Sequence, residues 1–128
     1  MNAPTPRPDP MEPLQLDAQA LAKLHELDPD GRHGVVRRVL QTFETTLARH
    51  IAELSEARDR GDMAVMGRIA HTMKPSSAAV GALALSALCA DVERQVRNGE
   101  TAGLLPRVAH LLTEADRALA AVRAMLRA

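Results

Sequence analysis

The chain has 128 residues, 46% of them apolar, and its 16 Lys and Arg residues balance 16 Asp and Glu residues. This length predicts one folded domain, and the zero net charge without a basic stripe argues against a nucleic-acid-binding protein. A single cysteine and the lack of a long apolar run exclude an internal disulfide and a membrane span, so a soluble cytoplasmic protein is expected.

The first 13 residues contain five prolines and few core-forming side chains, which predicts a disordered leader (1–13) ahead of a helical domain (14–128). Asp17 is a candidate N-cap for a short helix that extends to about Leu27. The sequence DPDG that follows then predicts a turn, because each of these residue types favours turn conformations.

Four longer helices are expected next, because apolar residues recur every three or four positions. Their expected ranges are about 34–60, 63–80, 82–97 and 101–127. Gly61 and Asn98-Gly99 end two of them, and Asp62 is a candidate N-cap. With one Phe and no Trp or Tyr, the core must be aliphatic, which suits closely packed helices. Short connections predict an all-α fold, an antiparallel up-down four-helix bundle with a short additional N-terminal helix.

The helix expected over 63–80 separates bulky side chains from a face of small residues around His71. On a helical wheel, the residues opposite His71 are Met66, Ile69, Met73 and Val80. The residues within about 80° of His71 are Gly67, Lys74, Ala78, Gly81 and Ala82. Each glycine costs a helix about 0.8–1.0 kcal/mol relative to alanine, which predicts that a partner's backbone or a phosphate approaches closely. The other interpretation of this face is a solvated histidine without a role.

His71 and Lys74, one helical turn apart, have the properties that phosphoryl transfer to a histidine requires. A neutral imidazole is a competent nucleophile near neutral pH, and a neighbouring ammonium neutralises phosphoryl charge. The sequence has no nucleotide-binding loop of the GxxxxGK[ST] or GxGxxG type and no HExxH metal motif. No cofactor of its own is therefore expected, and the phosphoryl donor and acceptor would be other proteins.

The segment that starts at His71, H-T-M-K-P-S-S-A-A-V-G, resembles the motif of histidine-containing phosphotransfer (HPt) domains of two-component phosphorelays. That motif is close to H-x-x-K-[GS]-[SA]-[SA]-x-x-[VLI]-G, and the stretches LDPDG, RGD and LCADVE are also similar to the family. The resemblance implies a monomeric phosphocarrier without kinase activity of its own. Its partners would be receiver domains of hybrid sensor kinases and response regulators, which carry the phosphorylated aspartate and hold the Mg²⁺ used in transfer.

The resemblance also implies roles for individual residues. His71 would accept the phosphoryl group, Lys74 would be the neighbouring cation, and Glu93 would hydrogen-bond the imidazole and fix its tautomer. The expected partner-binding residues are Gly67, Arg68, Ala78, Gly81 and Ala82. Arg68 flanks His71 and would meet an acidic receiver surface, although a solvated charge explains its presence equally well.

Pro75 departs from the family pattern, which has Gly or Ser at this position. Proline lacks the N–H that would bond the carbonyl of His71, and its ring clashes with that carbonyl in an ideal helix. A kink or local loosening is therefore expected just after His71, one that tilts Lys74 relative to His71 but leaves the site working.

Two other functions stay open at this stage. A dimerisation and phosphoacceptor fragment of a histidine kinase also places a proline soon after its histidine, although it usually has an acidic residue where Thr72 stands here. A helical adaptor would leave His71 without a chemical role.

The other candidate residues have structural interpretations. Cys89 is in phase with apolar neighbours and is expected to be a buried small residue. Ser76 and Ser77 are expected to pack or to bond back to a carbonyl. Surface or helix-end positions are expected for the remaining histidines, His25, His33, His50 and His110.

Overall fold

The computed structural model describes residues 14–128, and the predicted disordered leader lies outside the described residues. The elements are five helices, namely α1 (Ala18–Glu26), α2 (Val35–Arg60), α3 (Met63–Ala79), α4 (Leu83–Arg97) and α5 (Leu104–Arg127). No strand occurs between residues 14 and 128. The predicted all-α class is therefore confirmed.

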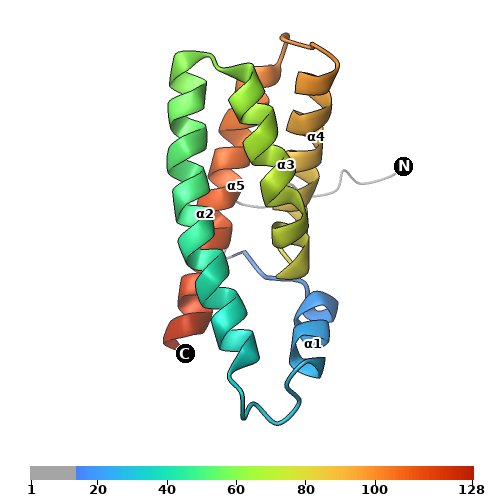
Figure 1. Cartoon of the computed structure of the whole chain (residues 1–128), viewed down its shortest axis with the longest axis vertical. Helices are drawn as coiled ribbons and strands as arrows, with labels where there is room; N and C mark the ends of the chain where they lie inside the picture. The colour runs from blue at the N-terminus through green and yellow to red at the C-terminus, as the bar shows by residue number, and fades with distance from the viewer. Residues whose placement is uncertain (1–13) are drawn as a thin grey trace, which may run out of the picture.

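The four longer helices lie side by side, and the chain reverses direction at each connection between them (Figure 1). α3 packs against α2 and α4, and α5 packs against the same two helices from the other side. The enclosed core is aliphatic except for Phe43, as the composition requires. The extensive contact of α3 with α4 matters most for function, because it joins the helix of His71 to the helix of Glu93.

Local capping explains where two of the helices begin. The Asp17 carboxylate accepts a hydrogen bond from the backbone N–H of Ala20 at 3.0 Å, and Asp62 accepts from the N–H of Val65 at 3.2 Å. Gly61, with φ of 67°, takes the left-handed conformation that ends α2. The N-caps predicted at Asp17 and Asp62 are confirmed.

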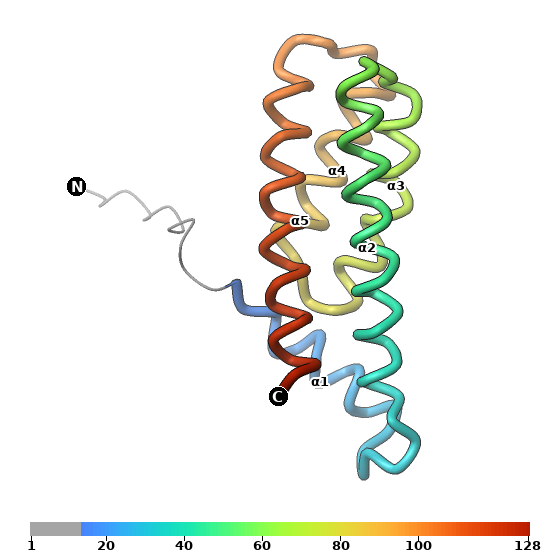
Figure 2. Tube along the Cα trace, turned by 90° about the vertical axis from the view of Figure 1, so that its left-hand side faces the viewer, coloured from blue at the N-terminus to red at the C-terminus, as the bar shows by residue number. Residues whose placement is uncertain are grey.

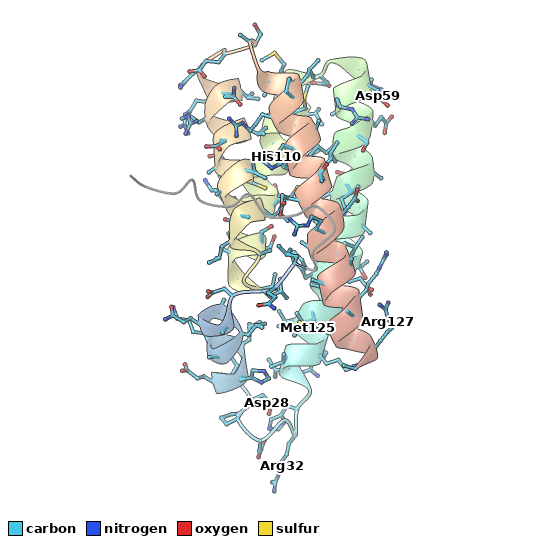
Figure 3. All side chains as sticks on the ribbon, turned by 180° about the vertical axis from the view of Figure 1, so that it is seen from behind. Asp28, Arg32, Asp59, His110, Met125 and Arg127 are labelled. Atoms are coloured by element: carbon cyan, nitrogen blue, oxygen red, sulfur yellow. The ribbon has the colours of Figure 1, made fainter. Side chains whose placement is uncertain are left out.

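Asp28 lies in the loop between α1 and α2 (Figure 3), where it is buried and organises the loop. Its carboxylate accepts from the N–H of His33 at 3.1 Å and from that of Val35 at 3.2 Å. Burial raises the pKa of Asp28, but the hydrogen bonds from Val35 and His33 outweigh it and hold this pKa below its ordinary value. The predicted turn is thus closed by a charged cap that also starts α2.

α1 crosses beneath the connection between α3 and α4 (Figure 2). The backbone N–H of Asp17 donates to the carbonyl of Gly81 at 2.9 Å. Gly81 has φ of 85°, and a Cβ atom there would lie 2.6 Å from the backbone nitrogen of Asp17. A glycine is therefore required at position 81 so that the segment before α1 can approach the turn.

The structure contradicts the predicted placement of one histidine and confirms the predicted burial of the cysteine. His50 was expected at the surface or a helix end, but it is buried because it shares the core-facing stripe of α2 with Leu47 and Leu54. Burial lowers the pKa of His50. Cys89 is completely buried as predicted, and burial raises the pKa of its thiol to about 12.

Candidate functional site

The imidazole of His71 stands on α3 with its side chain 72% exposed, and one ring nitrogen is held by the neighbouring helix. Nδ1 lies 2.7 Å from Oε2 of Glu93, which comes from α4 and is only 18% exposed. Because an ionised carboxylate can only accept hydrogen bonds, Nδ1 carries the proton in this pair and Nε2 keeps its lone pair. The outward nitrogen is thus the nucleophilic one.

Glu93 is ionised at neutral pH. The hydrogen bond with His71 lowers the pKa of Glu93, burial raises it, and the hydrogen bond and charge of Lys74 lower it further. The net direction is downward, so the carboxylate is charged at neutral pH. It can therefore fix the tautomer of a neutral His71 ring.

Two cations lie near the same Glu93 carboxylate. The Lys74 ammonium lies 3.2 Å from Oε1 of Glu93, and the Arg97 guanidinium lies 3.8 Å from that oxygen. One negative charge is thus shared by two permanent positive charges, which leaves positive potential beside His71. Such a site favours an anionic group at Nε2.

The close approach of α3 and α4 depends on Gly67, one turn before His71. Gly67 is buried, and a Cβ atom on it would lie 2.8 Å from Cγ1 of Val96. The expectation that Gly67 faces a partner is therefore wrong, because α4 covers Gly67. The missing side chain instead lets α4 come near enough for Glu93 to reach His71.

Gly81 and Ala82 also lie elsewhere than expected. Both are buried, because α3 ends at Ala79 and the chain then turns inward against the segment before α1. A wheel extended past the end of the helix could not predict this. Of the remaining expected partner-binding residues, Arg68 is exposed and Ala78 is half-buried on the same side of α3 as His71.

Pro75 does not end α3, which continues as an α-helix to Ala79. Ser76 donates its hydroxyl to the carbonyl of Met73 at 3.1 Å, which is one of the two roles predicted for this residue. Ser77 is buried, which agrees with its predicted packing role. The tilt of Lys74 that Pro75 was expected to cause stays a prediction.

An apolar groove adjoins the site on the side toward α1. It has a volume of about 570 Å³ and is lined by residues that include Leu24, Leu27, Pro75, Ala78 and Leu83. Leu27 is 66% exposed and Leu83 is 51% exposed, which is unusual for large apolar side chains. We call this feature the α1 groove. Sequence reasoning missed its two exposed leucines. Leu83 lies off the apolar phase of α4, which was an available signal, whereas Leu27 follows the buried Leu24 by three positions and gave none.

The part of the chain that the structure describes contains no cluster of three or more His, Cys, Asp or Glu residues arranged to hold a metal ion. In the same residues, no helix combines the length and hydropathy that crossing a membrane demands.

Comparison with known proteins gave two matches. A family model described as the Hpt domain matches residues 38–125. The crystal structure of histidine-containing phosphotransfer protein B (HptB) from Pseudomonas aeruginosa PAO1 is similar to this chain, with 29% sequence identity and a TM-score of 0.70. The similarity covers 88% of this chain and 90% of that chain. The comparison with curated proteins found no match.

Proposed function

Because this chain belongs to the Hpt domain family and is a histidine phosphotransfer protein, we propose that His71 is the residue that carries the phosphoryl group. The observation that carries this assignment is the pairing of an exposed imidazole with a recessed carboxylate, at 2.7 Å between Nδ1 and Oε2 of Glu93. The pairing leaves Nε2 open to a partner. The kinase-fragment and adaptor alternatives gain no support from the family match.

The transfer step follows from this geometry. Nε2 of His71 attacks the phosphorus of a receiver's aspartyl phosphate, so that an N–P bond forms while the P–O bond to the aspartate breaks. The aspartate leaves as a free carboxylate, and Nδ1 keeps its proton. The phosphorylated ring carries a positive charge, which the Glu93 carboxylate stabilises. The reverse sequence passes the group to a second receiver.

Lys74 serves this step as the neighbouring cation. Its ammonium already lies at the site, 3.2 Å from Oε1 of Glu93, and its side chain is partly exposed. From there a rotation of the flexible lysine side chain brings the charge to the phosphoryl oxygens. The protein itself acts as a phosphocarrier without kinase activity, and the Mg²⁺ of transfer belongs to the receiver.

We place the receiver over Arg68, His71, Ala78 and the α1 groove. Ala78 follows His71 by two helical turns, at nearly the same angle around α3, and lines this groove. The groove therefore continues the surface that surrounds the imidazole, and its exposed leucines supply apolar area for docking. The cytoplasmic location and the monomeric state stay predictions.

Phosphoryl uptake from a phosphorylated receiver domain tests the assignment of His71. Radiolabelled receiver is mixed with the wild-type chain, with His71→Gln and with His110→Gln, which changes an exposed histidine on α5 (Figure 3). We expect label on the wild type and on His110→Gln and none on His71→Gln. Undiminished labelling of His71→Gln would exclude His71 as the carrier.

A further inference from the structure

Ser86 on α4 makes a hydrogen bond that joins two helices at the site. Its hydroxyl donates to the backbone carbonyl of Lys74 on α3, at 2.9 Å and in a partly buried position. The other hydroxyls that bond a carbonyl within residues 14–128, those of Thr72, Ser76 and Thr113, do so inside their own helices. Ser86 therefore restrains one helix relative to another, which the other three do not.

The carbonyl that Ser86 binds directly precedes Pro75. Proline has no N–H, so α3 lacks the backbone hydrogen bond that residue 75 would donate to the carbonyl of His71. The backbone is thus least restrained by its own helix at the turn that carries the nucleophile. The hydroxyl of Ser86 restrains the backbone of this turn from the neighbouring helix α4.

Ser86 and Glu93 both lie on α4, and both bind Lys74 on α3. They are seven residues apart, so they lie two turns from each other and within about 20° around α4. Ser86 binds the carbonyl of Lys74, and Glu93 binds its ammonium. A shift of α3 along α4 that changed the distance between His71 and Glu93 would therefore also change the length of the Ser86 hydrogen bond.

We propose that Ser86 is a positioning residue for phosphoryl transfer, which replaces across the α3–α4 contact the backbone restraint that Pro75 removes. By fixing the turn of His71 against α4, it keeps Nδ1 within hydrogen-bond distance of Glu93. This role rests on the proposed function of His71 as the phosphoryl carrier.

The test compares Ser86→Ala, which removes the hydroxyl, with Ser86→Thr, which keeps it. We expect Ser86→Ala to slow transfer from receiver to His71 by roughly three- to tenfold, the effect of losing one neutral hydrogen bond, and Ser86→Thr to recover most of the rate. Thr113→Ala is the matched control, since it loses a hydroxyl-to-carbonyl bond on α5 and should leave the rate unchanged.

A second background tests the link to Pro75. Pro75→Ala restores the backbone N–H, so Ser86→Ala should cost clearly less in that background than in the wild type. An equal loss in both backgrounds, or no loss in either, would overturn the proposal. Thermal melts confirm that each variant is folded.

A spectroscopic readout separates this proposal from the function itself. The ¹⁵N signals of the His71 ring report whether the proton resides on Nδ1, without any phosphoryl transfer. In Ser86→Ala we expect a mixture of tautomers, and in Ser86→Thr the Nδ1–H form. Ring signals identical to those of the wild type in Ser86→Ala would contradict the positioning role, even if His71 never accepted phosphate.

Discussion

At the scale of single residues, one carboxylate organises the site. Glu93 binds Nδ1 of His71 through one oxygen and the Lys74 ammonium through the other. Its charge therefore has two effects, since it fixes the tautomer of the nucleophile and holds the cation nearby. Neither effect was derivable from local sequence, because Glu93 lies 22 residues after His71 and only the family resemblance pointed to it.

Replacing Glu93 by glutamine should slow transfer by roughly tenfold. The amide can still accept a hydrogen bond from Nδ1, but it carries no charge to stabilise the phosphorylated ring, and charge-assisted hydrogen bonds are the stronger ones. The measurement is the single-turnover rate from phosphorylated receiver to the variant chain. Asp91→Asn is a matched control, since Asp91 on α4 also pairs with two cations, Arg94 on α4 and Arg107 on α5. Equal rates for Glu93→Gln and wild type would refute the electrostatic role.

Asp28 gives the protein a pH dependence of stability. Its pKa is lower in the folded chain than in the unfolded chain, because backbone N–H groups of Val35 and His33 outweigh the effect of burial. The stabilisation is therefore complete above the ordinary carboxyl pKa of about 4 and is lost as the pH falls through the lower, folded value. Asp28→Asn should melt at a lower temperature than wild type at pH 7, and the difference should shrink below about pH 4. A difference in melting temperature as large at pH 3 as at pH 7 would refute this origin, and Asp116→Asn on α5 is the exposed control.

At the scale of helices, the ends were predictable and the contacts between helices were not. Asp17 and Asp62 cap helices by rules that involve only three or four neighbouring residues, so the sequence located them. Gly67 and Gly81 are small because other parts of the chain press on them, namely Val96 and Asp17. A helical wheel shows which residues share a face, but it does not show what covers that face.

Gly81→Ala should destabilise the fold more than Gly99→Ala does. Both glycines have positive φ, 85° and 68°, so both substitutions carry the strain of a left-handed residue, about 1–2 kcal/mol. Only Gly81 has backbone atoms in the way, whereas nothing lies within 4 Å of a Cβ at Gly99. We expect Gly81→Ala to lose about 1–3 kcal/mol more free energy of unfolding, measured by chemical denaturation. Equal losses in the two variants would show that the contact with Asp17 is unimportant.

At the scale of the whole molecule, the α1 groove lies beside the His71 site and is the surface on which we propose that the receiver docks. The sequence indicated the face of small residues on α3 but not the groove, because the walls of the groove come from α1, α3 and α4 together.

The wrong prediction for His50, a surface or helix-end position, has a different origin. Its spacing from Leu47 and Leu54 already placed it on the buried stripe of α2, so the sequence did contain the signal.

Charging the groove should weaken receiver binding. Leu83→Asp places a carboxylate among apolar side chains and removes apolar docking area, so the dissociation constant for a receiver should rise by roughly tenfold. Leu105→Asp is the matched control, because Leu105 on α5 is also 51% exposed and lies outside the groove. Calorimetry measures the dissociation constants. If both variants bound the receiver as tightly as wild type, the receiver would not dock on the α1 groove.

The buried cysteine offers a way to measure how often the helices of the native chain separate. Cys89 is the single cysteine of the sequence, lies in the core, and is near enough to Glu93 and Lys74 that their charges act on its thiol. With a pKa of about 12 and no access to solvent, this thiol reacts with a labelling reagent only when the helices separate. The labelling rate at saturating reagent therefore reports how often the helices that carry His71 and Glu93 come apart, without any probe being introduced.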